Sequence, residues 1–205
     1  GVPKIICNIR GTSGSGKSTV VRKIMEMGST EPIVRTSLSS SWGRPMKPAG
    51  YRIKLPGLSK LIYVLGHYEA PTGGADTIGS VIPCFNRVRD FHIAGHHVIF
   101  EGLLISRSKG RTIALWESLG MDVMKAFHLT TPLEQCLAGI DARRAAVGNV
   151  KPVNPAQTTA TYDRVLQISR SFQSDGYPIQ FVSRNEAVGC VVAAFYESER
   201  TEVHA

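Results

Sequence analysis

The sequence has little cysteine and no long apolar run, and each absence narrows the class of protein. Its four cysteines, Cys7, Cys84, Cys136 and Cys190, lie far apart in the 205 residues and match no metal-ligand spacing. Three of them fall in segments predicted as core strand or helix, which favours buried, reduced thiols over disulfides. No apolar run approaches the ~20 residues of a membrane span, and no secretory signal pattern opens the sequence. We therefore expect a cytoplasmic protein with no membrane partner.

Internal repeats and acidic or Gly/Ser-rich tails are also absent. The chain suits one domain, and its 42% apolar and 20% charged content is ordinary for a globular protein. The net charge is less ordinary, because 24 Lys and Arg against 16 Asp and Glu leave a charge of +8. A surplus of this size is compatible with a polyanionic partner. It is equally compatible with a basic surface that has no particular ligand.

Apolar periodicity predicts alternating strands and helices along most of the chain. The expected strands lie near residues 4–10, 33–38, 50–55, 60–66, 96–101, 123–130 and 178–183. The expected helices lie near 17–27, 77–94, 108–118, 132–147, 158–174 and 185–198. This alternation is typical of an α/β fold in which helices cover both faces of a parallel sheet.

Two segments interrupt the alternation. Residues 33–66 contain three strand-like pieces, no helix and two turn signals, which predicts an antiparallel flap inserted at about 33–60. The polar, proline-rich piece "GNVKPVNPAQTT" (148–159) separates two helices and is the candidate for a mobile lid, at about 141–158. We expect both to belong to a single domain that covers 1–205.

The stretch "GTSGSGKS" fits the phosphate-binding pattern G-x-x-x-x-G-K-[ST] over its full length. A strand pattern precedes it and a helix pattern follows, which is the context that phosphate binding needs. Its glycines let the backbone curl so that N–H groups grip phosphate oxygens, and the helix N-terminus faces the same anion. We expect Lys17 to reach the β- and γ-phosphates and Ser18 to bind Mg²⁺. The predicted ATP-binding residues are Gly11, Thr12, Ser13, Gly14, Ser15, Gly16, Lys17, Ser18 and Thr19.

Four stretches resemble the P-loop kinases, the family of nucleotide, nucleoside and small-metabolite kinases. They are the P-loop itself, "HHVIFEG" (96–102), the arginine-bearing helix "PLEQCLAGIDARRAA" (132–146) and the closing strand "YPIQFVSRN". The resemblance implies a parallel five-stranded sheet of order 2-3-1-4-5, covered by helices on both faces, with an inserted flap and a lid. Ligands collect at the carboxyl ends of the central strands in such a sheet.

An acidic loop, "GHYEAPTGGADTI" (66–78), follows the strand pattern "LIYVL". Asp76 resembles the aspartate with which hydroxyl-phosphorylating members of the family orient and deprotonate the acceptor. Its alternative role is that of a helix N-cap, worth about 1 kcal/mol of stability. Glu69 is the reserve base, and His67 and Tyr68 beside it are candidate substrate contacts or ordinary loop polarity.

A second acid, Glu101, ends the apolar run "VIFE" beside the P-loop. Its place resembles the Walker B position, at which an acid holds Mg²⁺ through water. A buried carboxylate without a cation would be costly. Ser18 and Glu101 are therefore the predicted magnesium residues.

Arg143 and Arg144 close the predicted lid helix. The family resemblance implies that one of them stabilises the charge on the transferring phosphoryl group. Their alternative role is to complement the dipole at the helix C-terminus. Arg107, just past "GLLIS", is a lesser candidate for a phosphate contact, and "SRNEAV" (183–188) is the candidate edge of the donor base site, although Asn185 also suits a helix cap.

The flap segment "RTSLSSSWGRPMKPAGY" resembles in position the acceptor-binding flap of guanylate-kinase-like enzymes. Its tryptophan amid cations suits base stacking combined with phosphate contacts, which makes Trp42, Arg44 and Lys47 candidate substrate residues. They are as well explained as the core of the flap and a solvated basic face.

The runs "YVLGHYEAPTGGADTI" and "VIFEGLLISR" resemble the bacteriophage kinases that phosphorylate 5-hydroxymethyluracil within DNA. The resemblance implies ATP and Mg²⁺ as cofactors, DNA as acceptor and a phage protein acting in the host cytoplasm. A catalytic base agrees with it, because an alcohol must be deprotonated during attack whereas a phosphate acceptor is already anionic. A kinase of free nucleosides or nucleoside monophosphates is the alternative, and a P-loop NTPase without kinase activity is the second alternative.

Overall fold

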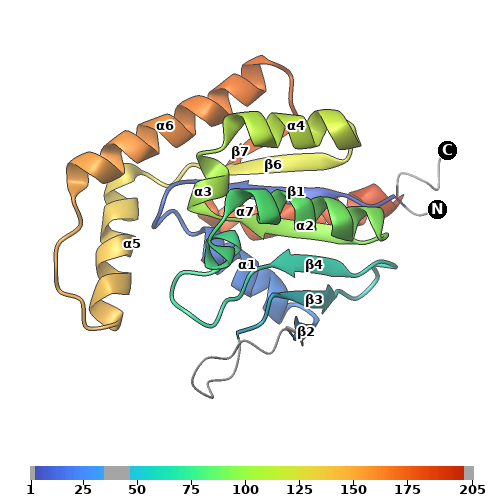
Figure 1. Cartoon of the computed structure of the whole chain (residues 1–205), viewed down its shortest axis with the longest axis horizontal. Coiled ribbons are helices and arrows are strands. Elements are labelled where there is room, and N and C mark those ends of the chain that lie inside the picture. The colour runs from blue at the N-terminus through green and yellow to red at the C-terminus, as the bar shows by residue number, and fades with distance from the viewer. Residues whose placement is uncertain (1–2, 35–46, 201–205) are drawn as a thin grey trace.

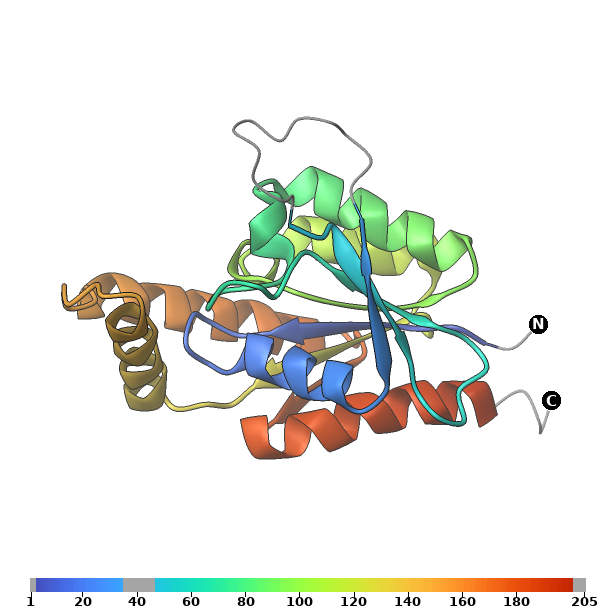
Figure 2. The same cartoon turned by 90° about the horizontal axis from the view of Figure 1, so that it is seen from below.

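The apolar residues before the P-loop form β1 (Ile6–Arg10), an inner strand of a mixed sheet. All five residues of β1 are buried. The computed structural model of the chain describes residues 3–34 and 47–200. In this part of the chain the sheet has seven strands, in the order β2-β3-β4-β5-β1-β6-β7. Helices cover both of its faces (Figures 1 and 2).

Five strands of the sheet run parallel to one another. Beside β1 they are β4 (Ile62–Leu65), β5 (His97–Glu101), β6 (Met124–Leu129) and β7 (Ile179–Val182). The other two, β2 (Ser29–Ile33) and β3 (Gly50–Lys54), pair antiparallel at one edge. The predicted sheet of five parallel strands is therefore wrong, because the flap strands extend the sheet. Numbered by themselves in chain order, the parallel strands lie as 2-3-1-4-5.

The predicted strand at 33–38 begins too late. The chain pairs as β2 from Ser29 to Ile33, and residues 35–38 lie outside the described part. Trp42 and Arg44 lie outside it too.

Each face of the sheet carries its own hydrophobic cluster. On one face α1 (Lys17–Glu26) and α7 (Arg184–Arg200) pack on the strands. On the other face the cover consists of α2 (Val81–Ile93), α4 (Lys109–Leu119) and the end of α6 (Pro155–Ser174). Helix α5 (Leu133–Ala146) and the start of α6 project beyond the sheet beside the P-loop (Figure 1).

The helix predicted at 77–94 is two elements. A short 3-10 turn, η2 (Ala75–Ile78), ends at Gly79, and α2 begins two residues later. Gly79 has φ +84°, a left-handed conformation that stops the turn from continuing as a helix. A further turn of helix that the sequence pattern did not predict, α3 (Leu103–Ser106), follows β5 directly.

Helix α6 begins at Pro155, three residues before the predicted start. The Asn154 side chain accepts hydrogen bonds from the N–H groups of Ala156 and Gln157, and proline suits the first helical position. Residues 147–154 thus connect α5 to α6 and fall within the predicted lid. No helix in 3–34 or 47–200 is both long and apolar enough to cross a membrane.

Candidate active site

The P-loop lies between the end of β1 and the start of α1, where the parallel strands end. Gly14 and Gly16 have φ values of +79° and +105°, which L-residues with a side chain rarely adopt. A Cβ at Gly14 would also overlap the carbonyl oxygen of Cys136, so the loop backbone touches α5 directly. Lys17 is buried, which lowers its pKa, and its Nζ donates to the Thr12 carbonyl at 2.9 Å.

Glu101 ends β5 next to the P-loop and is only 1% exposed. Its Oε1 accepts hydrogen bonds from the Ser18 hydroxyl at 3.3 Å and from the Tyr68 hydroxyl at 2.8 Å. Burial raises the pKa of Glu101, while the charge of Lys17 opposes the rise. The two residues predicted to hold magnesium are therefore in contact.

This oxygen pair fits Mg²⁺, a hard cation that favours oxygen ligands and keeps several waters. Among residues 3–34 and 47–200 no three His, Cys, Asp or Glu side chains gather as a metal site. Magnesium at Ser18 and Glu101 would consequently depend on nucleotide phosphates and water for its other ligands.

The loop from Gly66 to Gly74 folds against Glu101. Its ends pair through the Gly74 N–H, which donates to the His67 carbonyl at 3.0 Å, and the His67 N–H donates to the Thr77 hydroxyl at 3.1 Å. Tyr68 is buried between Glu101 and the guanidinium of Arg22, 5.5 Å from its ring centre. Burial and the neighbouring Glu101 raise the pKa of Tyr68. The hydroxyl of Tyr68 thus holds Glu101 in place.

The two candidate bases lie in different surroundings. The Asp76 carboxylate accepts the N–H groups of Leu103 at 2.7 Å and Leu104 at 3.1 Å, so it caps α3 rather than its own turn. It is close enough for its charge to act on both Lys17 and Glu101. Glu69 instead pairs with Lys47 at 3.4 Å on the surface. Asp76 is not among the residues that line the two large cavities described next.

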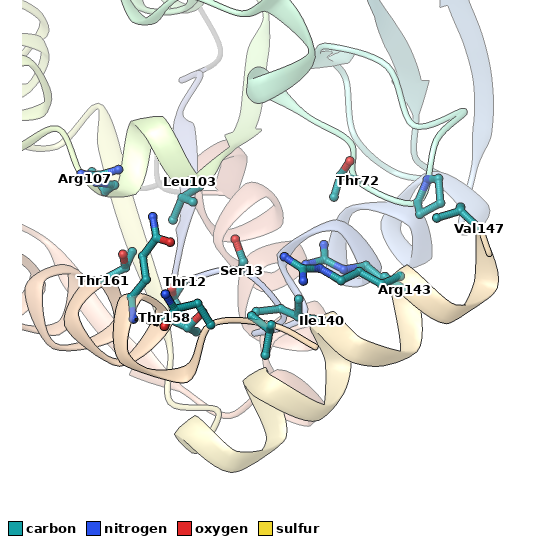
Figure 3. A pocket seen from close by; sticks show the side chains of 15 residues that line it. Thr12, Ser13, Thr72, Leu103, Arg107, Ile140, Arg143, Val147, Thr158 and Thr161 are labelled. Carbon is teal, nitrogen blue, oxygen red and sulfur yellow. Dashed lines mark hydrogen bonds between the residues drawn. The ribbon is translucent and has the colours of Figure 1, made fainter. Parts of the chain in front are cut away.

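Two cavities meet beside the P-loop. The first, of about 370 Å³, lies over the P-loop and is lined by Gly14, Gly16, Lys17, Ser18, Thr19, Arg22, Pro71, Gly139, Arg143 and Arg184. The second, of about 500 Å³, lies between the P-loop, α3, α5 and α6 (Figure 3). Its lining includes Thr12, Ser13, Leu103, Arg107, Ile140, Arg143, Arg144, Gln157, Thr158 and Thr161. Arg143 and Pro71 line both cavities.

The two lid arginines differ in their contacts. Arg143 lines both cavities, and burial lowers its pKa although the charge of Glu101 opposes this. Arg144 lines only the larger one, and its Nη1 donates to the Lys151 carbonyl at 3.3 Å.

A third, smaller cavity of about 150 Å³ adjoins the outer side of the P-loop and is lined in part by Gly16, Arg184 and Asn185. This is the region expected to edge the donor base. Asn185 does not cap α7, because Ser183 takes that place: its hydroxyl accepts the Glu186 N–H at 3.2 Å and donates to Glu186 Oε1 at 2.7 Å.

Several lining residues were not predicted from the sequence. Arg22 borders the P-loop cavity, and Thr72, Gln157, Thr158 and Thr161 border the larger one. Arg184, which also borders the P-loop cavity, falls within the stretch 183–188 that was expected to edge the donor base. The others lie on helix faces or, for Thr72, in the 66–74 loop, and which of them face a cavity depends on how the helices and this loop pack.

The site has the features of a P-loop phosphotransferase. Its curled backbone loop ends in a lysine and a serine, the neighbouring strand ends in an acidic residue, and a second cavity lies beside the one over the loop. None of the family models compared with the chain matches it. A "5-hmdU DNA kinase" of Pseudomonas phage PaMx11 is 37% identical over 183 residues, which cover 89% of this chain and 92% of the phage protein. The chain therefore belongs to the family of that kinase.

The crystal structure of a gluconokinase from Sinorhizobium meliloti 1021 shares the fold. It superposes with a TM-score of 0.50 over 99% of this chain and 97% of the gluconokinase, at 13% sequence identity. At this low sequence identity, the structural similarity is evidence for the fold alone.

Proposed function

We propose that this protein transfers the γ-phosphoryl group of ATP to the hydroxymethyl oxygen of 5-hydroxymethyluracil in DNA. The observation that carries the proposal is the pair of cavities that meet at Arg143, one over the P-loop and one beside it. A donor in the first and an acceptor in the second would face each other across that guanidinium. The printed name of the phage relative supplies the acceptor.

On the donor side, the P-loop N–H groups and the N-terminus of α1 would hold the ATP phosphates, and Lys17 would leave Thr12 for the β- and γ-phosphates. Thr19 lines the same cavity and suits the α-phosphate. When bound, Mg²⁺ neutralises charge on the phosphate oxygens, and Ser18 and Glu101 would hold it.

The larger cavity suits the acceptor. Its volume of about 500 Å³ lies within the range usual for small-ligand sites. Thr72, Gln157, Thr158 and Thr161 supply donors and acceptors of the kind that read the edge of a pyrimidine. A base within a duplex would have to leave the stack to enter, which costs a few kcal/mol.

Proton removal falls to Asp76 in this proposal. The N–H groups of Leu103 and Leu104 fix its carboxylate beside the segment that lines the acceptor cavity, and each oxygen keeps a lone pair for the acceptor hydroxyl. Arg143 would then stabilise the charge that spreads over the phosphoryl oxygens during transfer. Because two backbone N–H groups hold the Asp76 carboxylate, it needs little reorganisation at the moment of reaction.

Incubation with γ-labelled ATP and a panel of acceptors tests the proposal. The panel holds free nucleosides, nucleoside monophosphates, unmodified DNA and DNA that contains 5-hydroxymethyluracil. We expect label on the last alone, alkali-stable and lost in the Lys17→Ala variant. Label on a free nucleoside or monophosphate would establish the alternative kinase, and phosphate released without an acceptor would establish an NTPase.

Salt dependence provides a second test of the acceptor. Binding to duplex DNA should weaken with added salt with a slope of about 0.9 per neutralised phosphate. A free nucleotide would show the shallower dependence of a small ligand. Because the relative is a phage protein and both ATP and DNA are present in the infected cell, we place the reaction in the host cytoplasm.

A further inference from the structure

The connection between α5 and α6 exposes apolar side chains at the farthest point of the lid. We call residues 147–153 the lid tip. Val150 is 89% exposed and Val147 is 63% exposed. Isolated exposed valines are common on protein surfaces, so their number alone means little. Their position relative to the larger cavity is what distinguishes them.

The lid tip is continuous with the proposed acceptor cavity. Val147 and Val153 both line that cavity. Figure 3 shows Val147 at one end of it and Arg107 at the other. Figures 1 and 2 show the connection between α5 and α6 standing out beyond the end of the sheet, away from the helix layers. Val150 thus projects from the rim of the cavity into solvent.

Hydrogen bonds within the lid tip give it a defined shape. The Asn149 N–H donates to the Arg144 carbonyl at 2.8 Å, and its side-chain oxygen accepts the Lys151 N–H at 3.0 Å. Gly148 has φ +78° and turns the chain at the end of α5. The Val150 side chain, in the middle of this turn, is 89% exposed and does not fold against the helices.

Two cations belong to or contact the lid tip, and a third lies at the far end of the cavity. Arg144 binds the Lys151 carbonyl, Lys151 is itself exposed, and Arg107 lies across the cavity. None of these three makes an ion pair with an acidic side chain among residues 3–34 and 47–200. Exposed valines together with cations that make no ion pair in this part of the chain match duplex DNA, which offers stacked bases between two rows of phosphates.

We propose that the lid tip is a wedge that inserts Val150 into the base stack of duplex DNA and holds the acceptor nucleotide outside it. This rests on the proposed function, because only a base in a duplex has to be extracted. The side chain of Val150 would occupy the gap that the extruded base leaves, and Arg144, Lys151 and Arg107 would contact the flanking phosphates. The acceptor base would then enter the cavity beneath Val147.

The test compares double-stranded and single-stranded oligonucleotides that carry one 5-hydroxymethyluracil. In the Val150→Ser variant we expect kcat/KM to fall about tenfold on the duplex and to stay unchanged on the single strand, where no stack has to be opened. Val150→Leu, which keeps an apolar side chain, should retain the wild-type ratio. Ile93→Ser is the matched control, since Ile93 is a 64% exposed apolar residue at the end of α2.

A fluorescence measurement follows the wedge without relying on turnover. 2-Aminopurine placed beside the modified base brightens when it is unstacked, so the wild type should raise its emission and Val150→Ser should not. Two activity results for Val150→Ser would overturn the proposal. Equal losses on the duplex and on the single-stranded oligonucleotide would mean that the lid tip closes against the protein, and unchanged activity on both substrates would mean that it does not contact DNA.

The failure of the proposed function is distinguishable from the failure of the wedge. If the wild type phosphorylates neither substrate, the proposed function fails. If the wild type also gives no rise in fluorescence on the duplex, the wedge is overturned as well.

Discussion

At the scale of single residues, Glu101 connects the parts of the site. Its Oε1 receives hydrogen bonds from the P-loop through Ser18 and from the 66–74 loop through Tyr68. The charge of Lys17 partly offsets the cost of burying this carboxylate, and Asp76 adds a second negative charge nearby. In the proposed function, Mg²⁺ held by Ser18 and Glu101 would complete this balance of charge.

Lys17→Ala should abolish phosphoryl transfer while the protein stays folded. Lys17 donates only to the Thr12 carbonyl in the described structure, so its loss removes the charge that would meet the phosphates and leaves the core packing in place, although it also removes the charge that partly offsets the burial of Glu101. We expect a loss of at least about a hundredfold in rate, as for other preorganised charges. Transfer of label from γ-labelled ATP measures the rate, and thermal unfolding followed by circular dichroism checks the fold. Full activity in this variant would contradict the assigned role of the P-loop.

Asp76→Asn and Glu69→Gln together identify the base. Only Asp76 lies near Lys17 and Glu101, so Asp76→Asn should lower kcat strongly and leave the KM for ATP nearly unchanged. Glu69→Gln removes a surface ion pair with Lys47 and should change kcat less than twofold. Steady-state kinetics on the hydroxymethylated acceptor gives both values. A loss confined to KM in Asp76→Asn would assign Asp76 to binding, and a collapse of kcat in Glu69→Gln would make Glu69 the base.

At Gly74 the backbone of the 66–74 loop lies directly against Glu101. Its backbone has φ +82° and ψ −152°, and an added Cβ would overlap the Glu101 carboxylate. Gly74→Ala should therefore cost about 2 kcal/mol or more and reduce activity by displacing Glu101. Gly79→Ala is the matched control, because Gly79 also has positive φ but nothing lies within 4 Å of its Cβ position. We expect it to cost about 1 kcal/mol in urea unfolding with activity retained, so equal effects of the two variants would argue against the close contact.

At the scale of secondary structure, the elements that carry the P-loop were predictable and the sheet edge was not. The helices at 17–27, 132–147 and 185–198 were each placed within two residues of the observed ends, because the spacing of apolar residues determines them locally. Strand β2 reads "STEPI", with little apolar alternation and a proline at position 32. It forms a strand because it pairs with β3 at the edge of the sheet, where proline is tolerated. This pairing is a tertiary interaction, so the local sequence does not reveal it.

The site residues, like the helices and strands, divide into those that the sequence could predict and those that it could not. The P-loop and Glu101 could be read from motifs, since each lies directly where a strand ends. The bond between Tyr68 and Glu101 and the capping of α3 by Asp76 join segments 33 and 27 residues apart in the chain. No local pattern encodes such contacts, because they depend on how a loop folds back over its neighbour.

Glu199 joins three elements at the opposite end of the sheet. Its carboxylate accepts hydrogen bonds from the Ser59 and Lys60 N–H groups and from Nε2 of His97, which is fixed as the donor because Nδ1 accepts the Ile5 N–H. Glu199→Gln places an NH₂ group against these donors and should lower the free energy of unfolding by about 2 kcal/mol.

Activity at 20 °C should survive Glu199→Gln, because β5 separates His97 from Glu101 by about 13 Å. Glu26→Gln is the matched control on an exposed helix end and should stay within about 0.5 kcal/mol of the wild type. Urea denaturation measures both variants. An unchanged midpoint for Glu199→Gln would show that the end of α7 is not held by this carboxylate.

At the scale of the whole molecule, buried histidines make the stability of the protein depend on pH. Burial lowers the pKa of His92 and of His128 to about 4, and burial also lowers the pKa of His97. In the unfolded chain these histidines take up protons near pH 6.5, whereas the folded chain keeps His92 and His128 neutral until about pH 4. The unfolded state therefore binds more protons in this interval, and the free energy of unfolding falls as the pH falls.

Each of these two histidines should contribute a slope of up to about 1.4 kcal/mol per pH unit between pH 6 and 4.5. Glu101 acts in the opposite sense, since its raised pKa makes the folded chain the better proton acceptor there. The difference between wild type and His128→Asn isolates one histidine, because asparagine can reproduce the contact of Nδ1 with the Ser169 hydroxyl at 2.7 Å without titrating. Urea unfolding from pH 7 to 4.5 should give a shallower pH dependence for the variant. Parallel curves would contradict this prediction, because they would mean that His128 is protonated as readily in the folded protein as in the unfolded chain. Burial and the positive charges of Arg10, Lys17 and Arg170 disfavour that protonation in the folded protein.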